Sequence, residues 1–198
     1  MIPDPKLNPP TLSGKHVRLR PINDGDAAIY ALVTPISTFQ YYATAMPLEQ
    51  SEAGFRRYVD VILNSPNIQG FTCEILATSE VVGGTTYMDI RLADEHVEIG
   101  MTWYSPNWRG TFVNPECKLL LLTYAFESLG CTKVTLKCDN RNEWSKSAIL
   151  KLGAKHEGVL RRHKITDIGE WRDTSYYSIL KEEWPGVKAG LEERLRGF

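Results

Sequence analysis

EIGMTWYSPNWRGTFVNPECKLLLLTYAFESLG, residues 98–130, predicts a strand, a loop and a helix in succession. Apolar residues alternate with others over Val97–Tyr104, which is the pattern of a strand. The segment Ser105-Pro106-Asn107 ends the strand, because proline cannot donate a hydrogen bond to a sheet. We then expect a helix with Asn114 as its N-cap and Pro115 at its first position, ending at Gly130.

The loop in front of this helix is a candidate anion-binding site. It contains Arg109 and Gly110, and it leads to a helix N-terminus whose first N–H groups have no partner within the helix. These N–H groups and the helix dipole together attract phosphate. From the local pattern alone, an ordinary connection with a surface arginine explains the loop equally well.

Composition excludes several classes of protein. Lysine and arginine number 23 against 24 aspartates and glutamates, so the net charge of -1 gives no reason to expect a nucleic-acid partner. No apolar run is long enough to span a membrane, and the N-terminus lacks a signal-peptide core, so we expect a cytoplasmic protein. The four cysteines have no CxxC spacing and the four histidines no ligand spacing, which favours buried free thiols over disulfides or a metal site.

Strands and helices intersperse along the rest of the chain, as is typical of a mixed α+β protein. We expect one domain over residues 1–198, with an extended lead-in over 1–13 and a C-terminal extension over 183–198. Gly83 and Gly84 lie inside one predicted strand and indicate a bulge or a close backbone approach. The further predicted strands are 16–21, 70–77, 81–90, 133–138, 155–166 and 171–180; the further predicted helices are 27–33, 48–64, 143–152 and, broken by Pro185, 183–195.

The order of these elements and four local motifs resemble the GNAT N-acetyltransferase family, and within it the branch of ribosomal-protein-alanine acetyltransferase-like enzymes. The motifs are VRLRPINDGDA, the stretch 98–130, NRNEWSKSAILKLGAKHEGVLRRH and DTSYYSILKEEW. The resemblance covers about Leu12 to Trp184. It implies a mixed central sheet of about seven strands flanked by helices, and transfer of an acetyl group from acetyl-CoA to an amine.

The resemblance also implies where acetyl-CoA binds. The family holds the pyrophosphate on a loop of the form R/Q-x-x-G-x-G/A, in which Arg109 fits the first position, while Phe112 and Asn114 replace the usual small residues. A neighbouring strand pairs with the pantetheine arm through its main chain. Trp103 and Tyr104 of that strand could equally be core aromatics. The cofactor-binding residues implied here are Thr102, Trp103, Tyr104, Arg109, Gly110, Thr111, Phe112, Val113 and Asn114.

Three further residues are candidates for the site. Asn142 and Ser145 match the family's N-x-x-S segment, which implies contact with the cofactor, although both residue types also cap helices. Ile149 stands where many GNAT enzymes carry a tyrosine that protonates the departing thiolate, so Ser145 or a water would serve instead. Glu98 is the best-placed carboxylate for a general base, and a salt bridge that orients its strand is the alternative.

The function expected from the sequence is acetyl-CoA-dependent N-acetylation of a primary amine, either a peptide N-terminus or a small amine, by direct attack in a ternary complex. The alternative is a non-catalytic acyl-CoA-binding or regulatory module of the same fold. We expect a monomer or homodimer, with no nucleic-acid or membrane partner.

Overall fold

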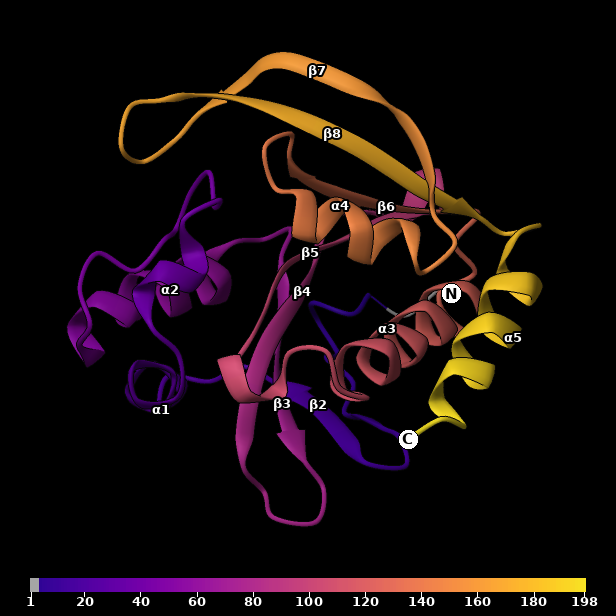
Figure 1. The fold of residues 1–198 in the computed structure, drawn as a ribbon, viewed down its shortest axis with the longest axis horizontal. Coiled ribbons are helices and arrows are strands. Elements are labelled where there is room, and N and C mark those ends of the chain that lie inside the picture. Colours follow the sequence, from indigo (N-terminus) through magenta and orange to yellow (C-terminus); the bar gives the residue numbers. More distant parts are fainter. Residues whose placement is uncertain (1–3) are drawn as a thin grey trace.

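The computed structural model describes residues 4–198. Their strands form one sheet in the order β1-β2-β3-β4-β5-β6-β8-β7 (Figure 1). Neighbouring strands are antiparallel except for β5 and β6, which are parallel. The expected α+β class and mixed sheet are confirmed, with eight strands instead of about seven. The strands are β1 (Leu12–Ser13), β2 (Val17–Pro21), β3 (Gln69–Ile75), β4 (Val81–Arg91), β5 (His96–Tyr104), β6 (Lys133–Asp139), β7 (Lys155–Ile165) and β8 (Trp171–Leu180). The α-helices are α1 (Asp26–Val33), α2 (Glu52–Asn64), α3 (Val113–Thr123), α4 (Glu143–Leu150) and α5 (Trp184–Leu195).

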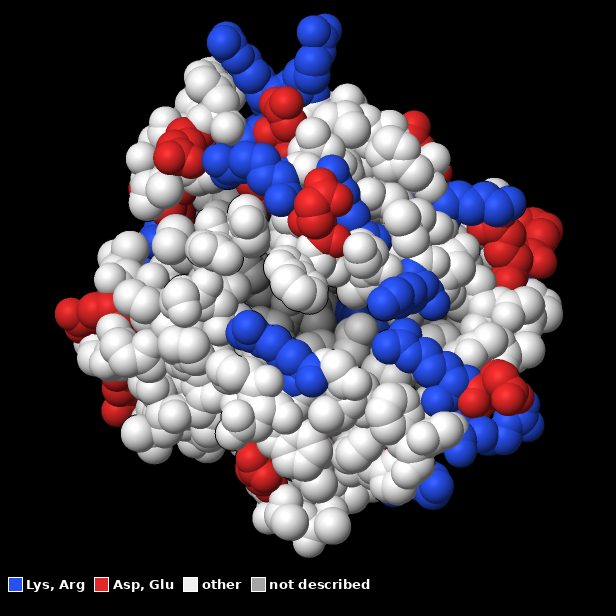
Figure 2. All heavy atoms as spheres, viewed as in Figure 1, with Lys and Arg blue, Asp and Glu red and all other residues white. Residues whose placement is uncertain are grey.

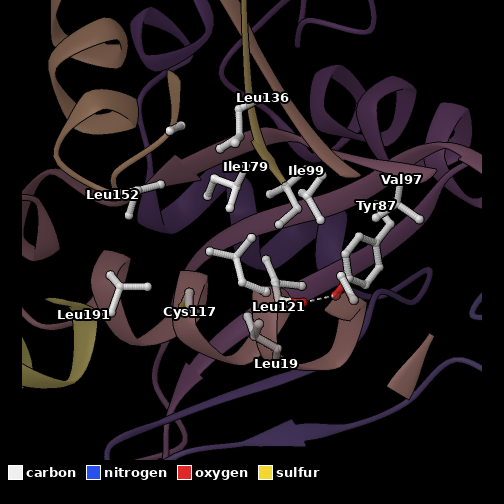
Figure 3. Packing of buried hydrophobic residues seen from close by; sticks show 14 of the residues in the cluster. Leu19, Tyr87, Val97, Ile99, Cys117, Leu121, Leu136, Leu152, Ile179 and Leu191 are labelled. Carbon is white, nitrogen blue, oxygen red and sulfur yellow. Dashed lines mark hydrogen bonds between the residues drawn. The ribbon is translucent and has the colours of Figure 1, made fainter. Parts of the chain in front are cut away.

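Helices cover both faces of the sheet, and each face has its own apolar cluster (Figure 1). On one face, α3 and α5 pack on the sheet through a cluster that includes Leu121, Ile179 and Leu191 (Figure 3). On the other face, α1 and α2 pack through a second cluster around Phe55 and Tyr58. The leucine run of α3 therefore lies between the sheet and α5, as its small polar face indicated.

Helix α3 begins earlier than expected. It starts at Val113, so Asn114 and Pro115 are its second and third residues and not its N-cap and first residue. Proline is tolerated at the third position because none of the first four N–H groups has a partner within the helix. After Thr123 the helix continues as a π-helical turn (Tyr124–Ser128) before Gly130.

The prediction of an extended lead-in over residues 1–13 is partly wrong, because some of the described residues 4–13 belong to the fold. Leu12–Ser13 pairs with β2 as β1, and Lys6 Nζ donates to the carbonyl oxygens of Ile62 and Leu63 at the end of α2. Residues 1–3 of the expected lead-in lie outside the described part of the chain.

At the C-terminus, Pro185 does not break the helix. It occupies the first turn of α5, where a missing N–H costs no hydrogen bond. Trp184 stacks on Phe126, with ring centroids 5.4 Å apart, so this segment belongs to the packed fold. Among residues 4–198, no helix has both the length and the apolar character that crossing a bilayer requires.

Candidate active site

Strands β5 and β6 pair along only part of their length. Residues His96–Ile99 of β5 pair with Lys133–Leu136 of β6, after which β5 continues to Tyr104 and β6 to Asp139 without pairing with each other. Main-chain groups of β5 beyond Ile99 that face β6 are therefore open to a ligand that lies between the strands. We call this opening the splay, and it corresponds to the place where the resemblance puts the pantetheine arm.

A β-bulge at Met101 shapes the β5 side of the splay. Met101 has a φ of 44°, and the register between β4 and β5 shifts between Gly84 and Thr86. Ile99 and Tyr104 are five residues apart and would face opposite sides of a regular strand. Both nevertheless lie in the cluster beneath α3, because the bulge inserts one residue between them.

Two glycines of β4 allow this bulged strand to lie close. A Cβ atom at Gly83 would lie 2.5 Å from the carbonyl oxygen of Trp103, and one at Gly84 would lie 2.8 Å from Trp103 Nε1. Any side chain at Gly83 would push the bulged strand away. The close backbone approach expected from this glycine pair is confirmed.

Two side chains of the strand expected to bind the cofactor, Trp103 and Tyr104, are buried within the protein. Trp103 is buried and its Nε1 donates to the hydroxyl of Tyr58 at 3.2 Å, while that hydroxyl donates to the carbonyl of Met101 at 3.3 Å. The ring of Tyr104 is also buried. Both side chains are core aromatics, so only main-chain groups of Trp103 and Tyr104 remain for a ligand.

Lys118 of α3 is a further candidate residue of the active site, and it was not among those expected from the sequence. It is 5% exposed, and its Nζ donates to Thr102 Oγ1 at 2.7 Å. That hydroxyl also pairs with Thr85 Oγ1 at 2.8 Å. Among residues 4–198, no carboxylate lies within 4.0 Å of this ammonium group, and burial lowers the pKa of Lys118 to about 8. The sequence offered one indication of this residue, namely a single lysine within the apolar run of α3.

The N-terminus of α3 presents free amide groups beside the splay. Within residues 4–198, the N–H groups of Gly110, Thr111, Phe112 and Asn114 donate no hydrogen bond. Gly110 has a φ of 77°, with open space where a side chain would begin. This arrangement fits a pyrophosphate, since several amides and the positive end of the helix dipole converge there. Figure 2 shows a hollow near the centre of this face of the molecule, with lysine and arginine side chains on its rim.

Arg109 is exposed and makes two contacts within the protein. Its Nε donates to the carbonyl of Tyr104 at 3.1 Å, and its Nη2 donates to Thr38 Oγ1 at 2.8 Å. Thr38 belongs to the segment 34–51 between α1 and α2, which we call the α1–α2 loop. The guanidinium group thus ties the loop before α3 to the α1–α2 loop and still has N–H groups for an anion.

Asn142 and Ser145 lie at the start of α4, on the opposite side of the splay. Asn142 Oδ1 accepts a hydrogen bond from the Ser145 N–H at 3.0 Å, so Asn142 caps the helix. The Ser145 side chain lies beside Cys138 of β6, whose pKa is raised by burial and lowered in part by this hydroxyl. Ile149, at the position of the family's tyrosine, is buried in the apolar cluster.

Glu98 lies where β5 and β6 are still paired, just before the splay. It is 7% exposed, and its Oε2 lies 2.6 Å from Lys137 Nζ of β6. Burial raises the pKa of Glu98 and outweighs the opposite effect of Lys137. The pKa of Lys137 is raised because its pairing with Glu98 outweighs its own burial. The salt bridge that was the alternative for Glu98 is thus present.

The chain is similar to known acetyltransferases in both sequence and fold. Residues 16–155 match the family described as "Acetyltransferase (GNAT) domain". The "Uncharacterized N-acetyltransferase" YoaA of Bacillus subtilis is 28% identical over 87% of this chain and 97% of its own. The "Putative ribosomal N-acetyltransferase" YdaF of the same organism is 28% identical over 67% of this chain and 68% of its own. A "putative acetyltransferase" from T. thermophilus superposes with a TM-score of 0.87 at 35% identity, covering 94% of this chain and 97% of the other. The splay, the free amides of α3 and these similarities agree, and the chain belongs to the GNAT family of acetyl-CoA-dependent N-acetyltransferases.

Proposed function

We propose that this N-acetyltransferase acetylates a primary amine, a peptide N-terminus or a small amine, by direct attack in a ternary complex. The observation that supports this proposal most strongly is the splay, with open main-chain groups of β5 on one side and free amides of α3 at its end. When bound, acetyl-CoA supplies the thioester whose carbonyl carbon the amine attacks. A C–N bond forms, the C–S bond breaks, and one proton leaves the amine nitrogen.

The residues of the chain divide between holding the cofactor and serving the chemistry. We assign the pyrophosphate to Arg109 and to the loop amides of residues 110–114, which are Gly110, Thr111, Phe112, Val113 and Asn114. The main chain of Thr102–Tyr104 holds the pantetheine arm as an added strand would. Asn142 has used its side-chain oxygen in capping, which leaves its Nδ2 to donate to that arm.

Proton transfer falls to two residues in this proposal. Glu98 accepts the proton of the amine, directly or through water, and its raised pKa suits a base that works near neutral pH. Lys137 holds the Glu98 carboxylate in place until then. Ser145, beside Cys138, donates a proton to the departing sulfur.

A non-catalytic acyl-CoA-binding module is the second candidate. The observations that favour it are the buried Ile149 in place of the family's tyrosine and the pairing of Glu98 with Lys137. Thiol release from acetyl-CoA in the presence of a mixed amine library distinguishes the two. Amine-dependent release supports acetyl transfer, whereas binding of acetyl-CoA without turnover on any amine supports the module.

We also infer the setting in which the enzyme works. We propose one catalytic domain over residues 1–198, acting in the cytoplasm as a monomer or homodimer. The similarity to YdaF, whose name refers to ribosomal N-acetylation, supports peptide N-termini as the first acceptors to test. Size-exclusion chromatography with light scattering tests the oligomeric state.

A further inference from the structure

The face of the sheet opposite α3 carries charged residues at the splay. Val134, Leu136 and Cys138 of β6 lie in the apolar cluster beneath α3, so the alternating Lys137 and Asp139 point to the other face. The same alternation places Arg172, Thr174 and Tyr176 of β8 on that face, since Tyr177 and Ile179 lie in the cluster.

The carboxylates that β5 and β6 place on this face, Glu98 and Asp139, are both already paired. Glu98 lies 2.6 Å from Lys137 Nζ, as described above. Asp139 accepts from the Arg141 side chain at 3.0 Å and from the Arg141 backbone N–H at 2.8 Å. Within residues 4–198, neither forms a second salt bridge with another cation.

Arg172 is a half-buried cation of this face that has no carboxylate partner among the described residues. Within residues 4–198 it has no carboxylate within 4.0 Å, and its buried Nε has no hydrogen-bond partner. Glu98 and Asp139 are near enough to favour its charge, yet burial lowers the pKa of Arg172. The pKa of the neighbouring His163 is lowered by burial and then by Lys164, Lys137 and Arg172, which shows that positive charge collects here. A half-buried guanidinium N–H without a partner is unusual, because buried polar groups are nearly always hydrogen-bonded.

Arg172 lies near the open end of the splay, on the face opposite α3, which we call the acceptor side. Asp139 of β6 pairs with Thr174, so Arg172 lies two residues further toward the open end. The loop after β7 reaches across to α2 on this side, where Asp167 Oδ2 lies 3.0 Å from Arg57 Nη1 and the Asp167 N–H donates to the Ala43 carbonyl at 2.9 Å (Figure 1). An acceptor amine that approaches Glu98 from this side passes Arg172.

We propose that Arg172 binds a carboxylate of the acceptor, so that the enzyme acts on amines that also carry an anionic group and disfavours polyamines. Arginine suits this task because its planar fork matches a carboxylate. Along β8, Arg172 lies about 13 Å from the level of Tyr176, which pairs with Lys137 beside Glu98. This separation favours acceptors whose carboxylate is several bonds away from the amine, as in a peptide. The inference rests on the proposed amine acetylation.

Steady-state kinetics on matched amines test it. A series of straight-chain amino carboxylates of increasing length is compared with the corresponding amides and with spermidine. The carboxylates should show a kcat/KM at least about tenfold higher than the amides, as expected for a charge-assisted hydrogen bond. Arg172→Gln should remove this preference, and Arg172→Lys should keep part of it. Arg161→Gln, which removes an exposed arginine of β7, should leave it unchanged.

A binding measurement separates this inference from the proposed function. The N-acetylated amino carboxylates are titrated into the protein with CoA present, and their affinity should fall in Arg172→Gln. Turnover of carboxylates and amides at equal rates in the wild type would overturn the inference while leaving amine acetylation intact. Arginine-dependent binding without turnover of any amine would support the anion site and sink the catalytic proposal instead.

Discussion

Replacing Lys118 by methionine should stabilise the protein at neutral pH. The pKa of this lysine falls from its usual 10.5 to about 8 because the ammonium group is buried without a carboxylate. At about 1.4 kcal/mol per pKa unit, keeping the cation in the folded state costs about 3 kcal/mol. Loss of the hydrogen bond to Thr102 offsets about 1 kcal/mol of the gain, which leaves a net stabilisation of about 2 kcal/mol. Methionine is unbranched and adapts to the vacated space.

The pH dependence of this gain follows from proton binding. Between about pH 8 and 10.5 the unfolded lysine holds its proton while the folded one has lost it, so the wild-type free energy of unfolding rises with pH relative to the variant. The advantage of the variant should therefore be largest below pH 8 and shrink as pH rises toward 10.5. Other buried groups with raised pKa values, such as Tyr58 and Cys131, are present in both proteins. Their contributions to the free energy of unfolding cancel when the two proteins are compared.

Urea denaturation of both proteins at several pH values between about 7 and 10 measures this difference. Lys151→Met, which removes an exposed lysine after α4, is the matched control and should show no such pH-dependent difference. A Lys118→Met variant that is less stable than the wild type, by an amount that does not vary with pH, would refute the reasoning.

Five further substitutions test the site and its scaffold. Arg109→Ala should weaken acetyl-CoA binding by about 1–3 kcal/mol, and an unchanged affinity in calorimetry would remove Arg109 from the pyrophosphate site. Glu98→Gln should lower kcat about a hundredfold near neutral pH, with a smaller loss at higher pH where the amine deprotonates unaided; normal turnover with lower stability would show a purely structural salt bridge. Asn142→Ala should cost about 1 kcal/mol of stability as a lost cap, and only a raised dissociation constant for acetyl-CoA would add a cofactor role; Ser145→Ala should lower kcat modestly at constant affinity, and unchanged kinetics would exclude it as a proton donor. Gly83→Ala should destabilise by about 1–3 kcal/mol, since its Cβ would overlap the Trp103 carbonyl, and an unchanged melting curve would contradict that overlap.

Much of the fold could be predicted because it depends on local pattern. The period of apolar residues identified the strands and helices, including β5 and α3, and the glycine pair of β4 indicated the close approach. The start of α3 could not be read correctly, because its N-cap is Phe112, which makes no side-chain cap, while the better capping residue Asn114 lies inside the helix. Likewise, the glycine pair indicated a bulge or a close approach without placing it, and nothing in the sequence marked Met101, whose left-handed conformation is uncommon for a residue with a side chain.

The candidate site was less predictable because its electrostatics depend on distant residues. Glu98 was identified from its place on β5, but its partner Lys137 lies on another strand, and no spacing rule connects them. The lack of a partner for Arg172 is likewise visible only in three dimensions, since it requires knowing where every nearby carboxylate is. The loop before α3 was the part of the candidate site that local sequence indicated most directly, although the helix begins at Val113, earlier than expected.

The short pairing of β5 with β6 also has a mechanical consequence. Within residues 4–198 it is the only ladder that joins the half-sheet β1–β5 to the half-sheet β6–β8, and it is four residue pairs long. The two halves are also joined on the face that carries α2, by the contacts of Asp167 with Arg57 and Ala43. A molecule bound in the splay would add contacts with both half-sheets, so hydrogen exchange of the amides in both should slow when acetyl-CoA is added.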